Sequence, residues 1–474
     1  MRKKTQIAIA CGAAVALVGG YLVGDAYDVV PGFLTVKPAP GDPGAPAEAS
    51  GAIEVKPRVV PDFEFDEDAP VPDTQAVADL VRDGIESDLN GDVSVYVTDA
   101  LTGDVIADTG ADHARIPAST TKLISGLTAL DAMGPEKTFT TEVVKGDDSS
   151  EVIIVGGGDI LLGEGDSDPE ALSGRGGVGT LAKETARQLE LQGVSDVSVR
   201  IDDSLFSGPE LHSSWSNSLM NEGWATPVVP MAIDQGKLRE EPQNEWYPTP
   251  VYDDAAKDVG EVFAEALEDQ GFTVKGSVER KTASSNATRL AAVESASLRE
   301  IVRQTLLVSD NALAEVVARL LAIELDLPGS FEGAATAMDK QMQRLGFDTT
   351  NMVLIDGSGL SEDARITPKT LVDLVDYAYN DSTLRDAVAH LPTAGFSGTL
   401  DDRMMDAGVA GLVRGKTGSL TGIRSLAGTV VTQDQRVLFY AIMADPGKSE
   451  AGWNAQVSID NIASALAECG CQGT

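Results

Sequence analysis

Histidine is scarce in this chain of 474 residues, which contains only His113, His212 and His390. Protein metal sites combine histidine, cysteine and carboxylate side chains at short, regular spacings. The three histidines are scattered and show no such spacing. The sequence therefore predicts no metal site and no cofactor, and it provides no histidine-based catalytic triad.

Cysteine is equally rare, and two of the three cysteines, Cys469 and Cys471, lie at the end of the chain. An exported protein can form a disulfide between them, although so short a loop would be strained. Free thiols or a bridge to another molecule are the alternatives. The sequence does not decide among these states.

Basic residues are outnumbered by acidic ones. The chain has 36 lysine and arginine residues against 74 aspartate and glutamate residues, which gives a formal net charge of −38. Nucleic acids and anionic membranes attract basic surfaces. The folded part is therefore expected to bind neither, and an acidic, soluble surface is the simplest interpretation.

The N-terminus has the pattern of an export signal. Three basic residues at positions 2–4 precede the apolar run Ile7–Val23, which is 17 residues long. That length fits either a cleaved signal peptide or a short membrane anchor. Both interpretations of residues 1–36 export the rest of the chain to the cell envelope. Contact with the membrane is expected only through this segment.

Residues 37–74 are predicted to form a linker, because eight of the chain's 22 prolines fall within them. Such a composition favours an extended, poorly packed segment. The remaining 400 residues are long enough for more than one domain.

A serine and a lysine three positions apart open a helix-like stretch. The motif Ser119-Thr120-Thr121-Lys122 is followed by apolar residues at helical spacing and by Gly134 as a stop signal. Ser119 and Lys122 are thus expected on one face of a buried helix. A neutral lysine can take the proton of a serine hydroxyl. Burial and a nearby charge on Lys416 would lower the pKa of Lys122. A solvated Ser/Lys pair at a helix start is the alternative.

The second motif, Ser309-Asp310-Asn311, precedes a strongly helical run over residues 312–321. Taken alone, Asp310 or Ser309 is a helix N-cap. The functional interpretation places Ser309 in the proton path between Lys122 and the leaving group. Asn311 would then bind a substrate amide and the lysine.

The third motif, Lys416-Thr417-Gly418-Ser419, is predicted to lie on or beside an antiparallel strand, since strand-like runs follow at residues 425–431 and 437–443. Lys416 and the hydroxyls of Thr417 and Ser419 suit a terminal carboxylate. Gly418 would let the backbone approach a ligand closely. The backbone N–H of Ser419 is a second candidate donor to an oxyanion, beside the helix N-terminus at Ser119. An ordinary strand edge is the alternative.

The motifs S-x-x-K, S-D-N and K-T-G, in this order, mark the penicillin-recognising enzymes. Over about residues 75 to 468 the chain resembles the low-molecular-mass class C penicillin-binding proteins, a D-Ala-D-Ala carboxypeptidase and endopeptidase family. Further segments that carry the resemblance are Gly156–Asp159, Ile201–Phe206, Asp356–Ser361, Gly398–Leu400 with Arg403, and Lys416–Leu420. The family often has Asp-Pro where this chain has Asp159-Ile160.

The resemblance implies a role for each motif. Ser119 is the nucleophile that becomes acylated, and Lys122 is its base. Ser309 and Asn311 assist, and Lys416 acts with Thr417 and Ser419 on the C-terminal carboxylate of the substrate. Ser361 and Arg365 fall where such enzymes line a pocket for the diamino-acid side chain of the stem peptide.

The spacing of the motifs distinguishes among the classes of penicillin-recognising enzymes. Ser119 and Ser309 are 190 positions apart (309 − 119). Class A β-lactamases have a much shorter gap, and they carry a deacylating glutamate after S-D-N. The corresponding stretch here, Lys340–Asn351, contains no glutamate. The extra length implies an inserted domain, as class C enzymes have.

The expected fold is α+β: the penicillin-recognising, β-lactamase-like antiparallel sheet flanked by helices, with a large insertion. We assign residues 75–138 and 291–474 to the catalytic domain and residues 139–290 to the insertion. The expected helices are 75–89, 178–191, 255–270, 298 to about 309, 312–321 and 454–466; short strands are expected at 93–97, 105–106, 142–144 and 152–155.

The expected function is removal of the terminal D-alanine from peptidoglycan stem peptides through a serine acyl-enzyme that penicillins inhibit. An endopeptidase that cuts peptide cross-links would use the same residues. A β-lactamase and a non-catalytic wall-binding protein are two further alternatives. The missing glutamate argues against the former, and the intact motifs argue against the latter. The oligomeric state is left open.

Overall fold

The computed structural model describes residues 68–85, 89, 92–239, 249–406, 408–446 and 452–470. The predicted signal or anchor, residues 1–36, and most of the predicted linker lie outside these ranges. Within them, no helix combines the length and apolarity needed to cross a membrane. Residues 65–474 form one compact unit.

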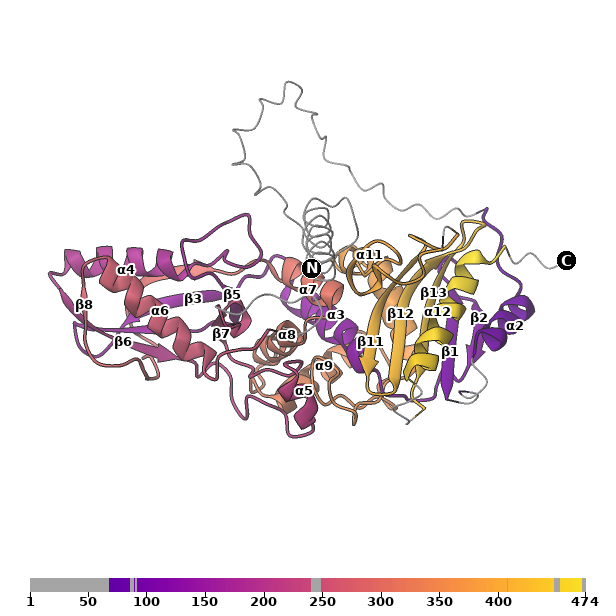
Figure 1. The fold of residues 1–474 in the computed structure, drawn as a ribbon, viewed down its shortest axis with the longest axis horizontal. Helices are drawn as coiled ribbons and strands as arrows, with labels where there is room; N and C mark the ends of the chain where they lie inside the picture. The colour runs from indigo at the N-terminus through magenta and orange to yellow at the C-terminus, as the bar shows by residue number, and fades with distance from the viewer. Residues whose placement is uncertain are drawn as a thin grey trace, which may run out of the picture. The chain divides into compact units, whose positions relative to one another are not determined.

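A five-stranded antiparallel sheet has the order β11-β12-β13-β1-β2 (Figure 1). Its strands are β1 (Val93–Asp99), β2 (Val105–Thr109), β11 (Val413–Leu420), β12 (Ile423–Val431) and β13 (Val437–Ala444). Every residue of the central strand β13 is buried. Both faces of the sheet are therefore covered, which explains the unbroken apolar run of this strand.

Alternate residues of β13 point to opposite faces of the sheet. Leu438 and Tyr440 belong to the core formed with α2 (Thr74–Gly84) and α12 (Gly452–Glu468). Phe439 and Ala441 belong to the core on the other face, with α10 (Pro368–Asn380). The predicted sheet flanked by helices is confirmed.

The first helix is shorter than predicted, because α2 ends at Gly84 rather than near residue 89 and Ile85 is already extended. Glycine disfavours helix. A Cβ at Gly84 would lie 2.7 Å from a side-chain carbon of Ile462 in α12. The close approach of the two helices thus requires glycine at the point where α2 stops.

Helices between the sheet and the rest of the chain carry two of the motifs. They are η2 (Ala118–Thr120), α3 (Thr121–Met133), α7 (Leu298–Val308), α8 (Asn311–Glu324) and α9 (Phe331–Arg344), with the short α11 (Arg385–Ala389) and η4 (Gly398–Leu400) further along. In α3, all ten residues from Thr121 to Leu130 are buried. This helix is therefore a central element of the core, as predicted from its apolar pattern.

A second, mixed sheet lies within the predicted insertion and has the order β10-β3-β4-β6-β8, with β9 also paired to β6. The elements of this region are β3 (Thr140–Lys145), β4 (Glu151–Val155), β5 (Asp159–Leu162), α4 (Val178–Leu191), β6 (Asp196–Asp202), α5 (Asn217–Asn221), β7 (Met231–Ile233), η3 (Asp234–Gly236), α6 (Ala255–Asp269), β8 (Thr273–Val274), β9 (Glu279–Arg280) and β10 (Arg289–Glu294). The boundary predicted at residue 290 falls inside β10. The division into domains stays a prediction.

The strands β4 and β6 pair in parallel, which the sequence did not indicate. Parallel neighbours need a crossover connection, and α4 lies in the segment that joins them. Strands β5 and β7 also pair in parallel and form a small separate sheet. Sequence patterning identified several of these strands but not their partners.

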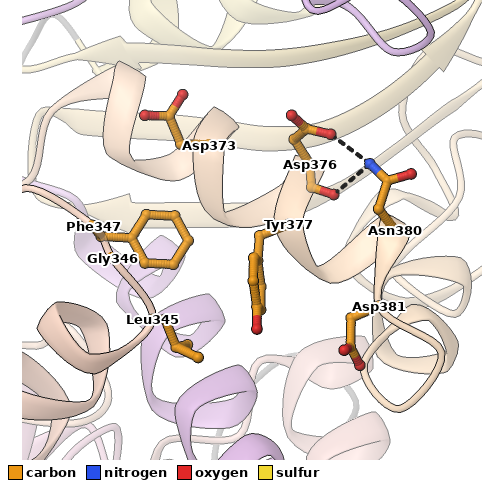
Figure 2. Close-up of a pocket in the computed structure, with 8 residues that line it drawn as sticks. All are labelled: Leu345, Gly346, Phe347, Asp373, Asp376, Tyr377, Asn380 and Asp381. Atoms are coloured by element: carbon orange, nitrogen blue, oxygen red, sulfur yellow. Dashed lines mark hydrogen bonds between the residues drawn. The ribbon is translucent and has the colours of Figure 1, made fainter.

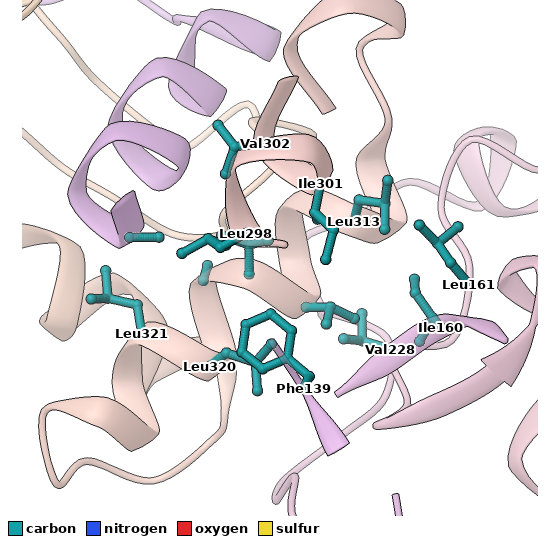
Figure 3. Close-up of a cluster of buried hydrophobic side chains, with 14 of the residues drawn as sticks. Phe139, Ile160, Leu161, Val228, Leu298, Ile301, Val302, Leu313, Leu320 and Leu321 are labelled. Carbon is teal, nitrogen blue, oxygen red and sulfur yellow. The ribbon is translucent and has the colours of Figure 1, made fainter. Parts of the chain in front are cut away.

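The predicted insertion shares a hydrophobic core with α7 and α8 (Figure 3). Phe139, Ile160, Leu161 and Val228 belong to the same buried cluster as apolar residues of the two helices; the latter are Leu298, Ile301, Val302, Leu313, Leu320 and Leu321. Burial of this apolar surface stabilises the packing of α8, which begins at the second motif.

Candidate active site

Ser119 lies in the turn η2, directly before α3. The preceding residue, Ala118, has φ 48°, in the left-handed region that is costly for a residue with a Cβ. Thr121 Oγ1 donates to the Ala118 carbonyl, which supports this conformation. Backbone strain of this kind collects at functional sites. The half-buried Ser119 side chain is thus presented by a strained turn at a helix start.

Lys122 is fully buried and has three acceptors around its ammonium. Its Nζ lies 2.8 Å from Ser119 Oγ, 2.7 Å from Asn311 Oδ1 and 2.8 Å from the carbonyl oxygen of Ser358. Three N–H bonds are all that an ammonium can donate. The predicted proximity of Ser119 and Lys122 is therefore present, and the predicted contact of Asn311 with the lysine is present as well.

The second motif joins two helices by a sharp turn. Ser309 ends α7 in the left-handed conformation, with φ 62°, and Asp310 caps α8 by accepting the backbone N–H of Leu313. The N-cap alternative is thus correct for Asp310. It does not compete with the functional interpretation, because the cap sets the start of α8 and so presents Asn311 to Lys122.

Lys416 lies on β11 and is also fully buried. Its Nζ donates to Ser309 Oγ at 2.9 Å and to the carbonyl oxygen of Thr417 at 2.8 Å. The hydroxyl groups of Thr417 and Thr399 are hydrogen-bonded at 2.7 Å. The third motif is therefore joined to the second through Ser309.

Gly418 has a packing reason to be glycine. A Cβ at this position would lie 2.0 Å from Ser425 Oγ and 2.6 Å from the carbonyl oxygen of Pro117. The strand β11 therefore passes directly against the turn that carries Ser119. Ser419, two positions before the hairpin that follows β11, is exposed. The contacts predicted for Thr417, Gly418 and Ser419 with a substrate stay predictions.

Burial lowers the pKa of Lys122 to about 8, whereas the carboxylates of Glu315, Asp356 and Asp310 act in the opposite direction. Burial, reinforced by the charge of Lys122, lowers the pKa of Lys416 well below its usual range. Lys416 is not among the groups that shift the pKa of Lys122, so the expectation that its charge lowers that pKa stays a prediction. Three carboxylate charges favour the protonated form of Lys122, whereas Lys416 donates to the neutral oxygens of Ser309 and Thr417.

A buried turn at residues 356–361 supports Lys122 through the carbonyl oxygen of Ser358. Asp356 accepts the backbone N–H groups of Gly359 and Ser361. A Cβ at Gly359, which has φ 80°, would lie 1.9 Å from the carbonyl oxygen of Ala118. This glycine therefore allows the turn to pack against the strained residue before Ser119. Sequence analysis identifies Asp356–Ser361 only as one of the segments that carry the resemblance.

Glu315 is the other residue that sequence analysis missed. It accepts the backbone N–H groups of Gly357 and Ser358. Burial, followed by the charge of Asp356, raises the pKa of Glu315 to about 7. A single acidic residue inside the apolar run of α8, one turn after Asn311, was the available signal.

Ser361 and Arg365 do not join the groups around Lys122. Ser361 is fully buried, and its Oγ accepts a hydrogen bond from Ser214 Oγ at 2.7 Å. The Arg365 guanidinium donates to the carbonyl oxygens of Glu362 and Ala364. Their predicted contact with a diamino-acid side chain stays a prediction.

One segment of the predicted insertion contacts both the S-D-N motif and the 356–361 turn. Trp215 Nε1 donates to Asp356 at 2.8 Å, the carbonyl oxygen of Trp224 accepts the amide of Asn311 at 2.8 Å, and Gln235 Nε2 donates to Asp310 at 2.8 Å. The predicted insertion thus helps to hold the residues around Lys122.

The structure also contains hollows away from these residues. One of about 440 Å³ lies between α10 and the turn after α9 (Figure 2). It is lined by Leu345, Gly346, Phe347, Asp373, Asp376, Tyr377, Asn380 and Asp381. None of these residues belongs to the three motifs. Among the described residues, no cluster of histidine, cysteine and carboxylate side chains could hold a metal ion.

Near the end of α12, Cys469 is buried and disulfide-bonded. Cys11 and Cys471 both lie outside the described residues. The prediction had left the state of Cys469 open.

The arrangement of Ser119, Lys122, Asn311 and Lys416 agrees with what sequence comparison finds. Residues 74–247 and 249–466 match the D-Ala-D-Ala carboxypeptidase 3 (S13) family. The chain belongs to this carboxypeptidase family. The family relationship expected from the motifs is confirmed, and membership implies action on cell-wall peptides outside the cytoplasm.

Individual relatives of the carboxypeptidase family span nearly the whole chain. Carboxypeptidase DacB of Mycolicibacterium smegmatis is 34% identical over 479 residues, which cover 98% of this chain and 95% of the relative. A carboxypeptidase of Mycobacterium tuberculosis is 34% identical over 438 residues, which cover 90% of each chain.

A solved structure has a similar fold. Penicillin binding protein 4 of Haemophilus influenzae matches with a TM-score of 0.67 at 20% identity, over 82% of this chain and 98% of that protein. The same protein has been solved in complex with a β-lactam. The predicted penicillin-recognising fold is therefore confirmed.

Proposed function

We propose that this protein is an active serine D-Ala-D-Ala carboxypeptidase in which Ser119 is the nucleophile and Lys122 is its base. The observation that carries the proposal is the environment of the Lys122 amine. A neutral lysine has two N–H bonds and one lone pair. Asn311 Oδ1 and the Ser358 carbonyl can only accept hydrogen bonds, so they take the two N–H groups. The lone pair is left facing Ser119 Oγ, 2.8 Å away.

The pKa of Lys122 suits this role. With a pKa of about 8, roughly one tenth of Lys122 is neutral at pH 7. A general base works best when its pKa is near the operating pH. Burial therefore converts a side chain that is normally protonated into a usable proton acceptor.

The first half-reaction forms an ester and releases D-alanine. Ser119 Oγ attacks the carbonyl carbon of the penultimate D-alanine while its proton passes to Lys122. Collapse of the tetrahedral intermediate breaks the peptide bond, and the leaving amine takes up a proton. We propose that the proton taken up by Lys122 reaches this amine through Ser309, whose hydroxyl accepts a hydrogen bond from Lys416 Nζ at 2.9 Å. In the second half-reaction water cleaves the ester and returns the hydroxyl to Ser119.

Lys416 is proposed to become protonated when the C-terminal carboxylate of the substrate binds. Burial lowers its pKa. A carboxylate bound by Thr417 and Ser419 would add a negative charge beside it, and an opposite charge favours the protonated form of lysine. Substrate binding would then restore the positive charge that recognises the free carboxylate.

The proposal also covers β-lactams, which would acylate Ser119 and persist. The β-lactam complex of the Haemophilus influenzae protein supports this expectation for the family fold. No glutamate occupies the Lys340–Asn351 stretch, where class A β-lactamases carry the deacylating group. Membrane attachment through residues 1–36 is a separate proposal that rests on the sequence alone.

One assay tests the function. The exported part of the chain is incubated with a labelled penicillin and, separately, with a stem peptide that ends in D-Ala-D-Ala. Stable labelling together with release of D-alanine is expected. Rapid turnover of the penicillin would indicate a β-lactamase. Cleavage of cross-linked dimeric peptides in preference to the free peptide would indicate an endopeptidase. Inertness toward all of them would contradict catalysis.

A further inference from the structure

Glu315 connects the S-D-N helix to the turn that faces Lys122. It lies four residues after Asn311 in α8, so the two side chains lie on one face of the helix. The Glu315 side chain is almost fully buried, at 1% exposure. Its Oε1 accepts the backbone N–H of Ser358 at 2.7 Å, and its Oε2 accepts that of Gly357 at 3.0 Å. Both carboxylate oxygens therefore bind the same turn.

That turn supplies one of the three acceptors of Lys122. The N–H of Ser358 points to Glu315, and the carbonyl oxygen of the same residue accepts from Lys122 Nζ at 2.8 Å. Ser125 Oγ donates to the carbonyl oxygen of Gly357 at 2.9 Å, which ties the turn to α3 as well. Residue 358 thus bridges a buried carboxylate and the buried lysine.

We propose that Glu315 is a positioning residue for the lysine base: it fixes the Ser358 carbonyl against Lys122 and supplies a buried negative charge that faces the lysine. The proposal rests on the proposed function, in which neutral Lys122 accepts the Ser119 proton. Without the two hydrogen bonds from the turn to Glu315, the Lys122 amine would lose a fixed acceptor. Its lone pair would then no longer be directed at Ser119.

The charge has a second effect, on the pH at which Lys122 becomes neutral. The charged groups that interact with the Glu315–Lys122 pair are Asp310 at the N-cap of α8, Arg319 on α8, Asp356 in the turn and Lys416 on β11. Among the carboxylates that raise the pKa of Lys122, Glu315 acts most strongly. A negative charge stabilises the protonated lysine, so removing it lowers the pKa of Lys122. More of the base is then neutral at a given pH.

Two substitutions separate the positioning of the Ser358 carbonyl from the effect of the Glu315 charge on the pKa of Lys122. Glu315→Gln keeps the size of the side chain but removes the charge and replaces one acceptor oxygen by an amide donor. The acid limb of the pH profile for penicillin acylation should move to lower pH by half a unit or more. The plateau rate should fall because one backbone N–H loses its acceptor. Glu315→Asp keeps the charge but withdraws the carboxylate, so the plateau should fall while the midpoint stays.

A matched control is available at Asp159. This carboxyl is also almost fully buried, and burial raises its pKa to about 7. It is not among the groups that act on Lys122. Asp159→Asn should therefore leave the midpoint of acylation unchanged, whatever it does to thermal stability.

A direct titration of Lys122 tests the proposal without measuring enzyme activity. In the inactive variant Ser119→Ala, NMR of ¹³Cε-labelled lysines follows the protonation of Lys122, whose signal is identified by its loss in Lys122→Met. Adding Glu315→Gln should lower the midpoint of this signal.

An unchanged midpoint in folded protein overturns the charge effect. If Glu315→Gln does not fold, a wild-type plateau in Glu315→Asp overturns the positioning role. Absence of penicillin labelling in the wild type would instead contradict the proposed function and leave the NMR result to decide on Glu315.

Discussion

The backbone carbonyl of Trp224 accepts a hydrogen bond from the side-chain amide of Asn311 at 2.8 Å. This contact fixes which end of the Asn311 amide faces the lysine. Because the NH₂ group is held by Trp224, the oxygen Oδ1 is left to accept from Lys122. An amide turned the other way would present N–H groups to the ammonium. The predicted insertion therefore helps to set the polarity of the active site.

The nucleophile is tested by Ser119→Ala. The change removes one half-buried hydroxyl, so folding should be unaffected. Covalent labelling by penicillin should be abolished, as intact-mass spectrometry will show. The thermal unfolding temperature should stay close to that of the native protein. An adduct of wild-type protein mapped to another serine would refute the assignment.

The lysine base is tested by the pH dependence of acylation. Protonated Lys122 cannot accept the Ser119 proton, and its pKa is lowered to about 8 by burial. The acylation rate should therefore rise with pH, by about tenfold per unit below the pKa, and level off above it. Stopped-flow measurements with a fluorescent penicillin give the profile. A rate that stays constant from pH 7 to pH 5 would rule out a lysine base. Chelators should have no effect on any of these rates.

Recognition of the free carboxylate is tested by Lys416→Ala. Loss of a charge-assisted hydrogen bond costs about 1.5–3 kcal/mol, which corresponds to about tenfold to a hundredfold in kcat/KM. Loss of the contact with Ser309 will add to this effect.

A peptide amidated at its C-terminus is the control for Lys416. The native enzyme should cleave the amide poorly, and Lys416→Ala should reduce cleavage of the amide much less than cleavage of the acid. Equal cleavage of acid and amide by the native enzyme would show that no carboxylate is recognised. An extended peptide site, as an endopeptidase needs, would then be favoured.

The contact between the insertion segment and the 356–361 turn is tested by Trp215→Phe. The indole N–H donates to the fully buried Asp356. Removing a hydrogen bond to a buried charged group destabilises by about 1.5–3 kcal/mol. Denaturant unfolding measures this loss, and acylation should slow because the turn also carries the Ser358 carbonyl.

Trp453→Phe is the matched control for Trp215, because Trp453 lies on α12 and is 71% exposed. Its replacement should change the free energy of unfolding by no more than about 0.5 kcal/mol. Equal effects of the two substitutions would show that the bond to Asp356 contributes nothing specific.

Local patterns predicted the helices and strands well where apolar periodicity was strong. The helix predicted at residues 178–191 has those bounds in the structure, and the helix predicted at 255–270 ends one residue earlier. The patterns failed where tertiary contacts decide the outcome. The parallel pairing of β4 with β6 depends on a neighbour more than 40 residues away, and α2 ends early at a glycine against which α12 packs closely.

The sequence by itself determined the family and the candidate nucleophile and base, because Ser119 and Lys122 are neighbours on one helical turn and their motif is local. Only the tertiary structure decided how the base is held. The acceptors of Lys122 come from residues 189 and 236 positions away in the chain. Trp224 acts through its backbone carbonyl, which leaves no signature in residue identity. Glu315 and Asp356 act through side chains that accept backbone N–H groups, so residue identity does not reveal their partners. Burial, which lowers the pKa of Lys122, is likewise a property of the packed chain and of no single segment.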